Sequence, residues 1–203
     1  NIKFYSLGER KMWVFGYGSL LWNPGFIYSK KEIARLEGYK RSFSMRSIHH
    51  RGTAENPGLV LALSRDAQSF CEGLAFEVEQ GKEVETLEYL RDRELVSSAY
   101  LEKNVLLNLK IGQSIKSLVY VIDEKHVQYC KLTLDEQAKV IAAANGGRGP
   151  NYEYLYSTRN KIAELGITDT DIEWLNPNIM RTEERPIGKE VNHGQCGINS
   201  NTL

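Results

Sequence analysis

The first residues whose types and spacing could do chemistry lie in "FGYGSLLW", residues 15–22, where two glycines flank a tyrosine and precede a serine. A dinucleotide-binding fingerprint would need a third glycine where Leu21 stands, and a phosphate loop would need a lysine that this stretch lacks. A nucleophile elbow places its serine between two glycines as G-x-S-x-G, whereas Ser19 directly follows Gly18 and precedes two leucines. The pattern therefore argues against a phosphate loop and against Ser19 as a nucleophile.

The same stretch predicts a strand that ends in a glycine-containing turn. Small residues let a ligand approach the backbone, and consecutive N–H groups of such a turn can point into a concavity. That geometry binds a carboxylate or an oxyanion. The alternative interpretation is a glycine-rich strand end or bulge that binds nothing.

Glu94, near the end of a predicted helix, is the second candidate. Leu87, Leu90 and Glu94 fall at i, i+3 and i+7, so a carboxylate shares a face with two leucines that should point at the core. Burial would raise the pKa of this carboxyl group, which suits a general acid or base near neutral pH. The alternative is a structural ion pair with the neighbouring Arg91 or Arg93.

Other reactive side chains offer less. His49 and His50 are neighbours, which is not the spacing of a zinc pair on a strand or a helix. Cys71 lies in a strand-like run without a glycine turn or helix N-terminus to lower its pKa, so we expect a buried, inert thiol. Cys71, Cys130 and Cys196 are widely spaced and odd in number, which argues against a disulfide framework. We predict neither a metal site nor a cofactor.

The composition limits the partners. Lys plus Arg and Asp plus Glu number 26 each, so no overall field favours nucleic acid, an anionic membrane or an acidic partner. No apolar run is long enough to span a bilayer, and the first ten residues lack the pattern of a secretory signal. We therefore expect a single cytoplasmic domain over 1–203 that acts on a small molecule, with neither nucleic acid nor membrane as partner.

The elements that must position these residues are six predicted strands and three predicted helices. The strands are apolar, partly alternating segments at 12–17, 36–45, 58–64, 71–79, 100–109 and 117–123. The helices cover 82–95, 134–144 and 152–165. Thr133 and Glu136 have the spacing of a capping box at the start of the second helix.

The order of these elements indicates the fold class. Only one helix separates the fourth and fifth strands, and elsewhere strands follow strands, so repeated βαβ units do not fit. We expect an α+β protein with a mostly antiparallel sheet or small barrel and flanking helices. After about residue 176 the sequence turns polar, and we expect a partly loose C-terminal extension over 176–203.

Four blocks of the sequence together resemble the ChaC-like γ-glutamylcyclotransferases, glutathione-degrading enzymes of the γ-glutamylcyclotransferase fold. In chain order the blocks are "MWVFGYGSLLWNPGF" (12–26), "HHRGTAENPGLVLAL" (49–63), "EYLRDRELVSSAY" (88–100) and "GGRGPNYEYLYSTRNKIAELGI" (146–167). Their order and spacing cover about residues 12–175. The sequence departs from the family pattern at "SFSMRSIHHRG" and "ELVSSAY", which concerns substrate preference more than reaction type.

The resemblance implies roles for particular residues. Glu94, after Arg93, matches the family's catalytic glutamate, and Tyr154 matches the tyrosine of the family's "EYL". The family's γ-glutamyl-binding loop corresponds here to Gly16, Tyr17, Gly18, Ser19, Leu20 and Leu21. In the implied reaction the substrate's own α-amine attacks its γ-carbonyl, and glutathione is cleaved to 5-oxoproline and cysteinylglycine without a cofactor.

Two alternatives stay open at the level of sequence. One is a cyclotransferase for another γ-glutamyl amino acid or amine. The other is a non-catalytic regulator that binds a small ligand on the same fold. The ligands of Arg46, Arg51 and Arg148 are not assigned, although Arg148 in a glycine-rich loop could reach a substrate carboxylate.

Overall fold

The structure, a computed structural model, describes residues 11–183 of the 203-residue chain. Five strands close into a barrel in the order β1-β3-β2-β4-β5. They are β1 (Trp13–Gly16), β2 (Tyr28–Ser47), β3 (Gly58–Val78), β4 (Tyr100–Leu109) and β5 (Ser114–Ile122). All pairs of neighbours are antiparallel except β1 and β5, which pair in parallel at Val14 and Leu118. The expected α+β class with a mostly antiparallel barrel is confirmed.

The prediction of separate strands at 58–64 and 71–79 is wrong, because both belong to the continuous strand β3. Partners of β3 on β2 change from Tyr39↔Arg65 to Glu37↔Phe70, so the single residue Gly38 lies opposite residues 66–69. This irregularity is closed locally, since Ser69 Oγ donates to Asp66 Oδ2 at 2.6 Å. The polar residues that indicated a turn therefore form a bulge, and β3 keeps its direction.

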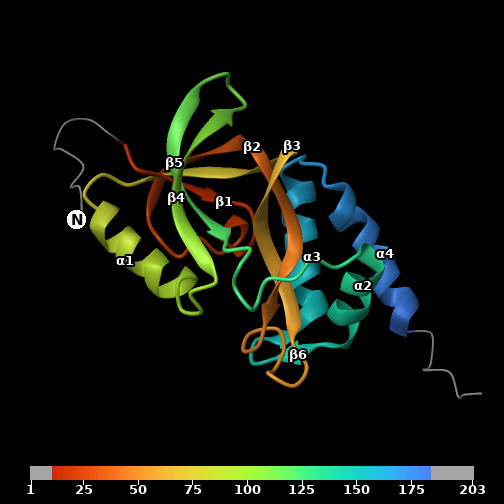
Figure 1. The fold of residues 1–203 in the computed structure, drawn as a ribbon. Helices are drawn as coiled ribbons and strands as arrows, with labels where there is room; N and C mark the ends of the chain where they lie inside the picture. The colour runs from red at the N-terminus through yellow and green to blue at the C-terminus, as the bar shows by residue number, and fades with distance from the viewer. Residues whose placement is uncertain (1–10, 184–203) are drawn as a thin grey trace, which may run out of the picture.

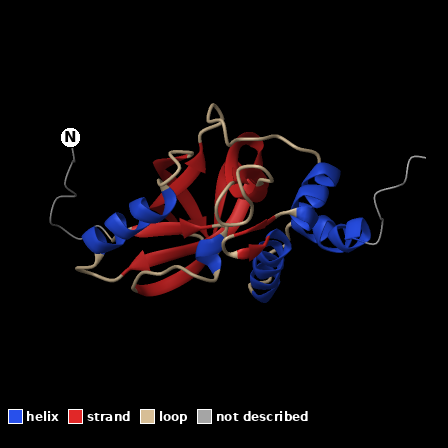
Figure 2. Cartoon of the chain, turned by 90° about the horizontal axis from the view of Figure 1, so that it is seen from below, coloured by secondary structure: helices blue, strands red, loops and turns tan. Residues whose placement is uncertain are grey.

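Helices cover the barrel on two sides. Figures 1 and 2 show α1 (Glu83–Glu94) on one side and α2 (Leu134–Ala143), α3 (Asn151–Glu164) and α4 (Thr170–Glu183) on the other. A one-turn 3₁₀ helix, η1 (Ser19–Leu21), follows β1, and two short strands, β6 (Asn145–Gly146) and β7 (Gly149–Pro150), precede α3. The three predicted helices are thus present, and the capping box of Thr133 and Glu136 is confirmed at the start of α2.

Helix α4 was not predicted. Ile172, Leu175 and Ile179 lie at helical spacing and are buried, although most of the intervening residues are polar and Pro177 stands inside the helix. Near that proline, Asn178 Nδ2 donates to the Trp174 carbonyl at 2.6 Å. The expected polar extension thus begins as a helix that runs to residue 183, and residues 184–203 lie outside the described residues.

Besides a minor cluster around Ala62 and Ala99, the hydrophobic core has a large cluster and a small cluster. The large cluster fills the barrel and continues between the barrel and the helices α2, α3 and α4, with Phe43, Leu63, Leu107, Leu155 and Ile172 all almost completely buried. The small cluster lies under α1, where Leu90 packs with Val14, Leu20, Val78, Leu118 and Tyr120. Helix α1 therefore rests on a smaller apolar base than the three helices opposite.

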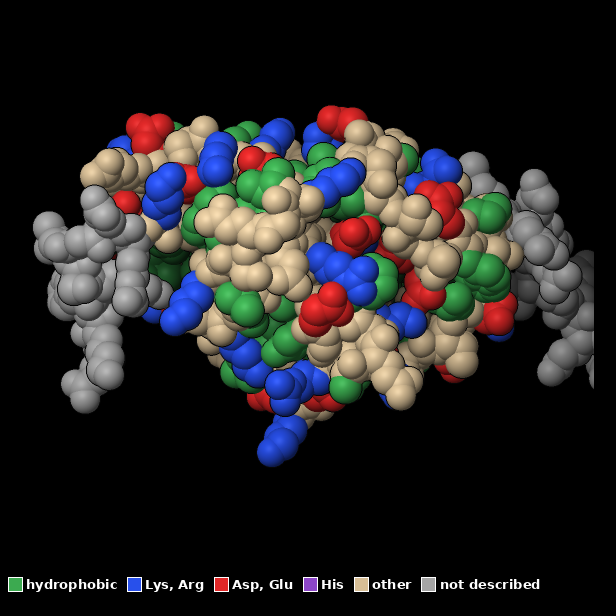
Figure 3. All heavy atoms as spheres, turned by 90° about the horizontal axis from the view of Figure 1, so that it is seen from above, with side chains coloured by type: hydrophobic (Ala, Val, Ile, Leu, Met, Phe, Trp, Pro, Cys, Tyr) green, Lys and Arg blue, Asp and Glu red, His purple; other side chains and the backbone are tan. Residues whose placement is uncertain are grey.

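Charged side chains of both signs lie on the surface of the described residues. On the face shown in Figure 3, basic and acidic side chains are interspersed. Within residues 11–183, no helix combines the length and the apolar character needed to cross a lipid bilayer.

Candidate active site

The turn after β1 is a tight loop built on two glycines. Leu21 N–H donates to the Gly18 carbonyl at 2.9 Å, which closes η1. A Cβ on Gly16 would lie 3.0 Å from Leu20 Cβ, and a Cβ on Gly18 would lie 3.1 Å from the hydroxyl of Tyr154. Both glycines are therefore required by close approach of neighbouring groups, and any larger side chain at Gly18 would displace the Tyr154 hydroxyl.

The backbone of this loop offers donors. Within residues 11–183, the N–H groups of Gly18, Ser19 and Leu20 donate to no protein acceptor, whereas the Leu21 N–H is already used inside η1. The side chains of Leu20 and Leu21 are buried in the core at 6% and 3% exposure. What the loop can present to a small molecule is therefore mainly its backbone, in the manner of an anion-binding nest.

Glu94 is the last residue of α1. Leu90 on the same face is fully buried, and Glu85, Glu88 and Asp92 are exposed, as their spacing predicts. The Glu94 side chain is 18% exposed. Burial raises the pKa of its carboxyl group above the usual glutamate value, and the charge and hydrogen bond of Arg93 oppose that rise without cancelling it.

Arg93 connects Glu94 to the loop, 74 residues away from Ser19 in sequence. Its guanidinium donates to Ser19 Oγ at 2.7 Å, to the Asn23 carbonyl at 2.7 Å and to the Tyr89 hydroxyl at 2.8 Å. The remaining Nε lies 3.1 Å from Glu94 Oε1. The structure thus brings the sequence-predicted loop and the sequence-predicted carboxylate together through one side chain. The ion pair with Arg93 and the raised pKa of Glu94 occur together, so the two interpretations of Glu94 are not exclusive.

Three tyrosines, two of them buried and Tyr100 partly buried, lie within the electrostatic influence of this carboxylate. The pKa values of Tyr17, Tyr100 and Tyr154 are raised, first by burial and in part by the negative charge of Glu94. The Tyr17 hydroxyl donates to the Tyr120 carbonyl at 2.9 Å, and the Tyr100 hydroxyl donates to the Leu61 carbonyl at 2.9 Å. These phenols therefore stay protonated at neutral pH.

Tyr154 is packed in the core and also borders the loop. Its ring packs edge-on against Trp22 and Phe43, with ring centroids 5.4 Å and 5.9 Å away, so it is part of the core. Its hydroxyl nevertheless reaches the backbone of the loop at Gly18. A substrate held by the loop would therefore lie beside this hydroxyl.

Two further loops, around residues 48–57 and 147–148, meet close to the start of β3. Gly147 and Arg148 donate their N–H groups to the carbonyls of His49 and His50, each at 2.8 Å. His49 and His50 lie on a loop and are largely exposed. The part of the His50 side chain that is covered loses hydration, and this loss together with the positive charge of Arg148 lowers the pKa of His50. The histidines are thus neither on a strand nor arranged as a zinc pair.

The arginines left unassigned by sequence differ in their surroundings. Arg51 donates to the Pro150 carbonyl at 3.0 Å and to Glu153 Oε2 at 3.3 Å, and its guanidinium lies 5.9 Å from the ring centroid of Tyr154. The backbone of Arg46 pairs with Gln128. Only Arg51 is therefore tied to a residue that borders the loop.

Cys71 is buried, as expected. Cys71 lies in β3 at 2% exposure, and burial raises the pKa of its thiol to about 11 against the opposing charge of Arg41. Cys130 is also buried, and Cys196 lies outside the described residues.

A surface hollow of about 350 Å³ lies on another side of the loop. Its lining comes from the loop, from β2 and β3 and from α3: Leu21, Trp22, Pro24, Tyr28, Lys31, Phe76, Ser157, Lys161 and Glu164. Glu94 is not part of that lining. The loop and Glu94, where the donors and the perturbed carboxylate meet, remain the better site for proton transfer.

One residue that contacts the loop was not singled out from the sequence. Arg41, in β2, donates to the Tyr17 carbonyl at 3.1 Å and is 4% exposed. An arginine inside the apolar strand segment "YKRSFSM" is the signal that could have found it, because a buried charge needs a specific partner.

Comparisons with known proteins point to one family. The family model described as ChaC-like protein matches residues 12–181. The "Glutathione-specific gamma-glutamylcyclotransferase" of Escherichia coli (strain K12) is 34% identical over 162 residues, which are 79% of this chain and 69% of that protein. The protein of the same name from Schizosaccharomyces pombe is 35% identical over 81% of this chain and 89% of its own length.

A solved structure extends the similarity to three dimensions. The crystal structure of a selenomethionine-labelled yeast gamma-glutamyl cyclotransferase specific to glutathione superposes with a TM-score of 0.77 at 25% identity. The superposition covers 86% of this chain and 97% of the yeast chain. The barrel and its flanking helices are therefore shared with that structure.

Proposed function

The chain belongs to the ChaC-like protein family, and from this premise we propose that it is a glutathione-specific γ-glutamylcyclotransferase. The substrate is glutathione, and the products are 5-oxoproline and cysteinylglycine. The proposal needs no cofactor, because the nucleophile belongs to the substrate.

The reaction is an intramolecular aminolysis. The α-amine of the γ-glutamyl group attacks the γ-carbonyl carbon, so one C–N bond forms and closes the five-membered ring. The amide bond to cysteine breaks, and its electron pair leaves with the cysteinylglycine nitrogen. From α-ammonium to lactam N–H the attacking nitrogen loses two protons, and the leaving nitrogen gains two as it becomes an ammonium group, so atoms and charge balance without water. The enzyme must hold the two ends together and relay these protons.

We assign the proton transfer to Glu94. Its carboxylate would take the proton from the α-ammonium group and return it to the leaving nitrogen. A glutamate with a raised pKa is well matched to this double role, because it is a better base than an exposed glutamate and still releases the proton. Arg93 keeps the carboxylate beside the loop.

We assign substrate binding to the loop. The N–H groups of Gly18, Ser19 and Leu20 would hold an anionic group of the substrate or the oxyanion that develops on the γ-carbonyl, with the hydroxyl of Tyr154 beside them. Gly16, Tyr17 and Leu21 would shape the loop by packing and backbone contacts. Losing one such donor typically costs about a hundredfold or more in rate.

A single observation carries the proposal: one guanidinium, that of Arg93, joins the donor loop to a carboxylate of raised pKa. The test is incubation of the purified protein with glutathione, followed by chromatographic detection of 5-oxoproline and cysteinylglycine in equal amounts. A protein that is folded and releases neither product would contradict the proposal.

The same assay separates the alternatives. Release of 5-oxoproline from γ-glutamyl-alanine but not from glutathione would indicate a cyclotransferase for another γ-glutamyl compound. Saturable glutathione binding without product would indicate a non-catalytic regulator on this fold. The cytoplasmic location and the lack of a nucleic-acid partner remain predictions from composition, and cell fractionation and a salt-dependent mobility shift would test them.

A further inference from the structure

We propose that Arg41 is a positioning residue: its buried guanidinium fixes the peptide between Tyr17 and Gly18, so that the Gly18 N–H points toward the substrate. The inference rests on the proposed function of the loop. It assigns to β2 and α4, which lie away from Glu94 in sequence, a direct part in orienting a substrate donor.

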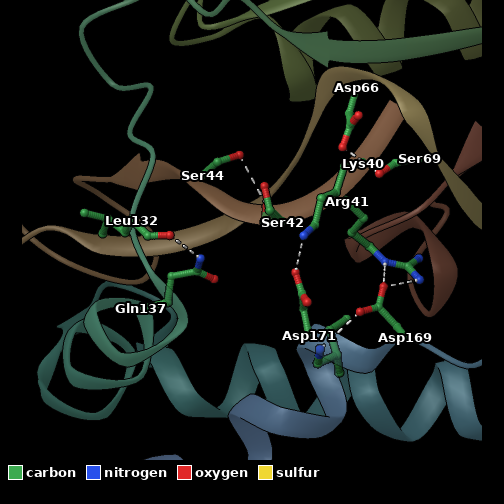
Figure 4. A network of polar contacts seen from close by, with 11 residues as sticks. Lys40, Arg41, Ser42, Ser44, Asp66, Ser69, Leu132, Gln137, Asp169 and Asp171 are labelled. Atoms are coloured by element: carbon green, nitrogen blue, oxygen red, sulfur yellow. Dashed lines mark hydrogen bonds and ion pairs between the residues drawn. The ribbon is translucent and has the colours of Figure 1, made fainter. Parts of the chain in front are cut away.

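The contacts of Arg41 are fully specified. Its side chain is 3% exposed, and its Nη1 donates to the Tyr17 carbonyl at 3.1 Å and to the Glu72 carbonyl at 2.9 Å. Its Nε and Nη2 both lie 2.9 Å from Asp169 Oδ2. Figure 4 shows the guanidinium reaching this carboxylate at the start of α4. Four directed contacts leave the guanidinium little freedom to rotate.

A hydrogen bond to a carbonyl oxygen also orients the next N–H. In a planar trans peptide the C=O and the N–H point in opposite directions, and no cis peptide occurs in residues 11–183. Arg41 therefore sets the direction of the Gly18 N–H by holding the Tyr17 oxygen on the protein side. The Gly18 N–H is one of the loop donors without an acceptor among the described residues.

Asp169 is in turn fixed by the first turn of α4. Its Oδ1 accepts the Ile172 N–H at 3.1 Å, and its carbonyl accepts the Glu173 N–H at 2.9 Å. Ile172 is itself 1% exposed in the core, which anchors this turn. The position of the Tyr17–Gly18 peptide is thus coupled through two side chains to the docking of a helix.

The neighbouring pair Lys40–Asp171 provides a matched control. It joins β2 and α4 with Nζ and Oδ2 2.8 Å apart, but the two side chains are 47% and 24% exposed. Figure 4 shows both pairs side by side, and within residues 11–183 the ion-pair partner of Lys40 is Asp171, which is not part of the loop. Breaking it removes an ion pair between the two elements without touching the Tyr17 carbonyl.

The test compares Arg41→Lys with Lys40→Met in the full chain. A single ammonium cannot serve Asp169 and two carbonyls in the fork geometry of a guanidinium. We expect Arg41→Lys to lower kcat/KM for glutathione by about tenfold or more, with a rise in KM, because a donor is misdirected. Loss of folded protein would lower kcat alone. Lys40→Met should stay within about twofold, as for other exposed ion pairs.

A second readout is independent of turnover. In glycine-selective ¹⁵N-labelled protein, the Gly18 amide resonance should move in Arg41→Lys and stay in place in Lys40→Met. If Arg41→Lys does not fold, Asp169→Asn is measured in the same way, since asparagine keeps an acceptor for the Ile172 N–H.

The outcomes decide the role of Arg41 separately from the proposed function. If the wild-type protein releases no 5-oxoproline, the proposed function is wrong. The Gly18 amide resonance would still show whether Arg41 orients the Tyr17–Gly18 peptide. A folded Arg41→Lys protein with wild-type kinetics and an unmoved Gly18 resonance would overturn the inference. An equal loss of kcat/KM in Lys40→Met would also overturn it, because any link between β2 and α4 would then suffice.

Discussion

Two arginine–carboxylate pairs contact the loop after β1, and they differ in the number of hydrogen bonds that the carboxylate accepts. Asp169 receives two contacts from Arg41 at 2.9 Å and one backbone N–H. Glu94 receives one contact from Arg93 at 3.1 Å, and its carboxylate accepts no other hydrogen bond within residues 11–183. The two side chains are nevertheless similarly exposed, at 15% and 18%.

Exposure therefore does not separate the structural carboxylate of Asp169 from that of Glu94, to which we assign proton transfer. The two carboxylates differ in how many N–H donors of the paired arginine they receive. Arg41 directs two of its four contacts at Asp169, whereas Arg93 directs three of its donors to Ser19, Asn23 and Tyr89 and only one to its neighbour. The second carboxylate is left with a raised pKa and with capacity to accept a proton.

The largest expected effect comes from Glu94→Gln, which keeps shape and removes the proton acceptor. We expect 5-oxoproline release from glutathione to fall by about a thousandfold or more, since general acid and base steps contribute about 10²–10⁴ each. Glutathione binding, measured by calorimetry, should persist. Glu88→Gln, on the exposed face of α1, is the control and should work as wild type. Near-wild-type turnover in Glu94→Gln would remove this residue from the mechanism.

Gly18→Val should weaken substrate binding by about tenfold or more, because the loop donors lie beside a tightly packed hydroxyl. The added Cβ would lie 3.1 Å from the Tyr154 hydroxyl and 3.6 Å from Leu61 Cβ. Calorimetry with glutathione in the Glu94→Gln background avoids turnover during the measurement. Gly112→Asn, at the β4–β5 turn, is a control: an added Cβ there meets nothing within 4 Å, and the strain that asparagine meets at its φ of +88° arises in that turn. Equal affinity in both variants would argue against substrate contact at Gly18.

The parts of this site that could be predicted are those set by local patterns. Helical spacing placed Glu94 beside buried Leu90, and the glycines around Tyr17 indicated a turn with free donors. The contacts of Arg41 could not be predicted, because its partner Asp169 is 128 residues away and the pairing depends on how α4 docks.

The errors in the fold have the same origin. The bulge at Asp66 and Ser69 has the composition of a turn, and only its pairing with β2 shows that the strand continues. Helix α4 contains Pro177 between polar residues, and this composition has a low intrinsic helix propensity. Burial of Ile172, Leu175 and Ile179 outweighs that low propensity. Local sequence determined element types where tertiary packing did not override them.

Removal of the carboxylate charge should change the stability of the fold with opposite signs in the two pairs. Asp169→Asn leaves a buried guanidinium without its counter-charge, and we expect a loss of about 1–3 kcal/mol in the free energy of unfolding. For Glu94 the folded-state pKa lies above the unfolded value, so ionisation destabilises the fold as pH rises through that folded pKa. At neutral pH, Glu94→Gln should therefore keep or raise the melting temperature in calorimetry. A lower melting temperature in Glu94→Gln would mean that its pair with Arg93 is structural.

The smallest expected effect is a displacement of the pH profile in Arg93→Met. The base form of Glu94 is required, so the acid limb of kcat/KM should lie above the usual glutamate pKa of about 4.3. Arg93 opposes the rise in that pKa, and its removal should move the limb to still higher pH, whatever the absolute rate. Arg91→Met is the control, because Arg91 pairs with Glu102 and is 44% exposed on the same helix. If the acid limb moves equally in both variants, or moves to lower pH in Arg93→Met, then Arg93 does not lower the pKa of Glu94.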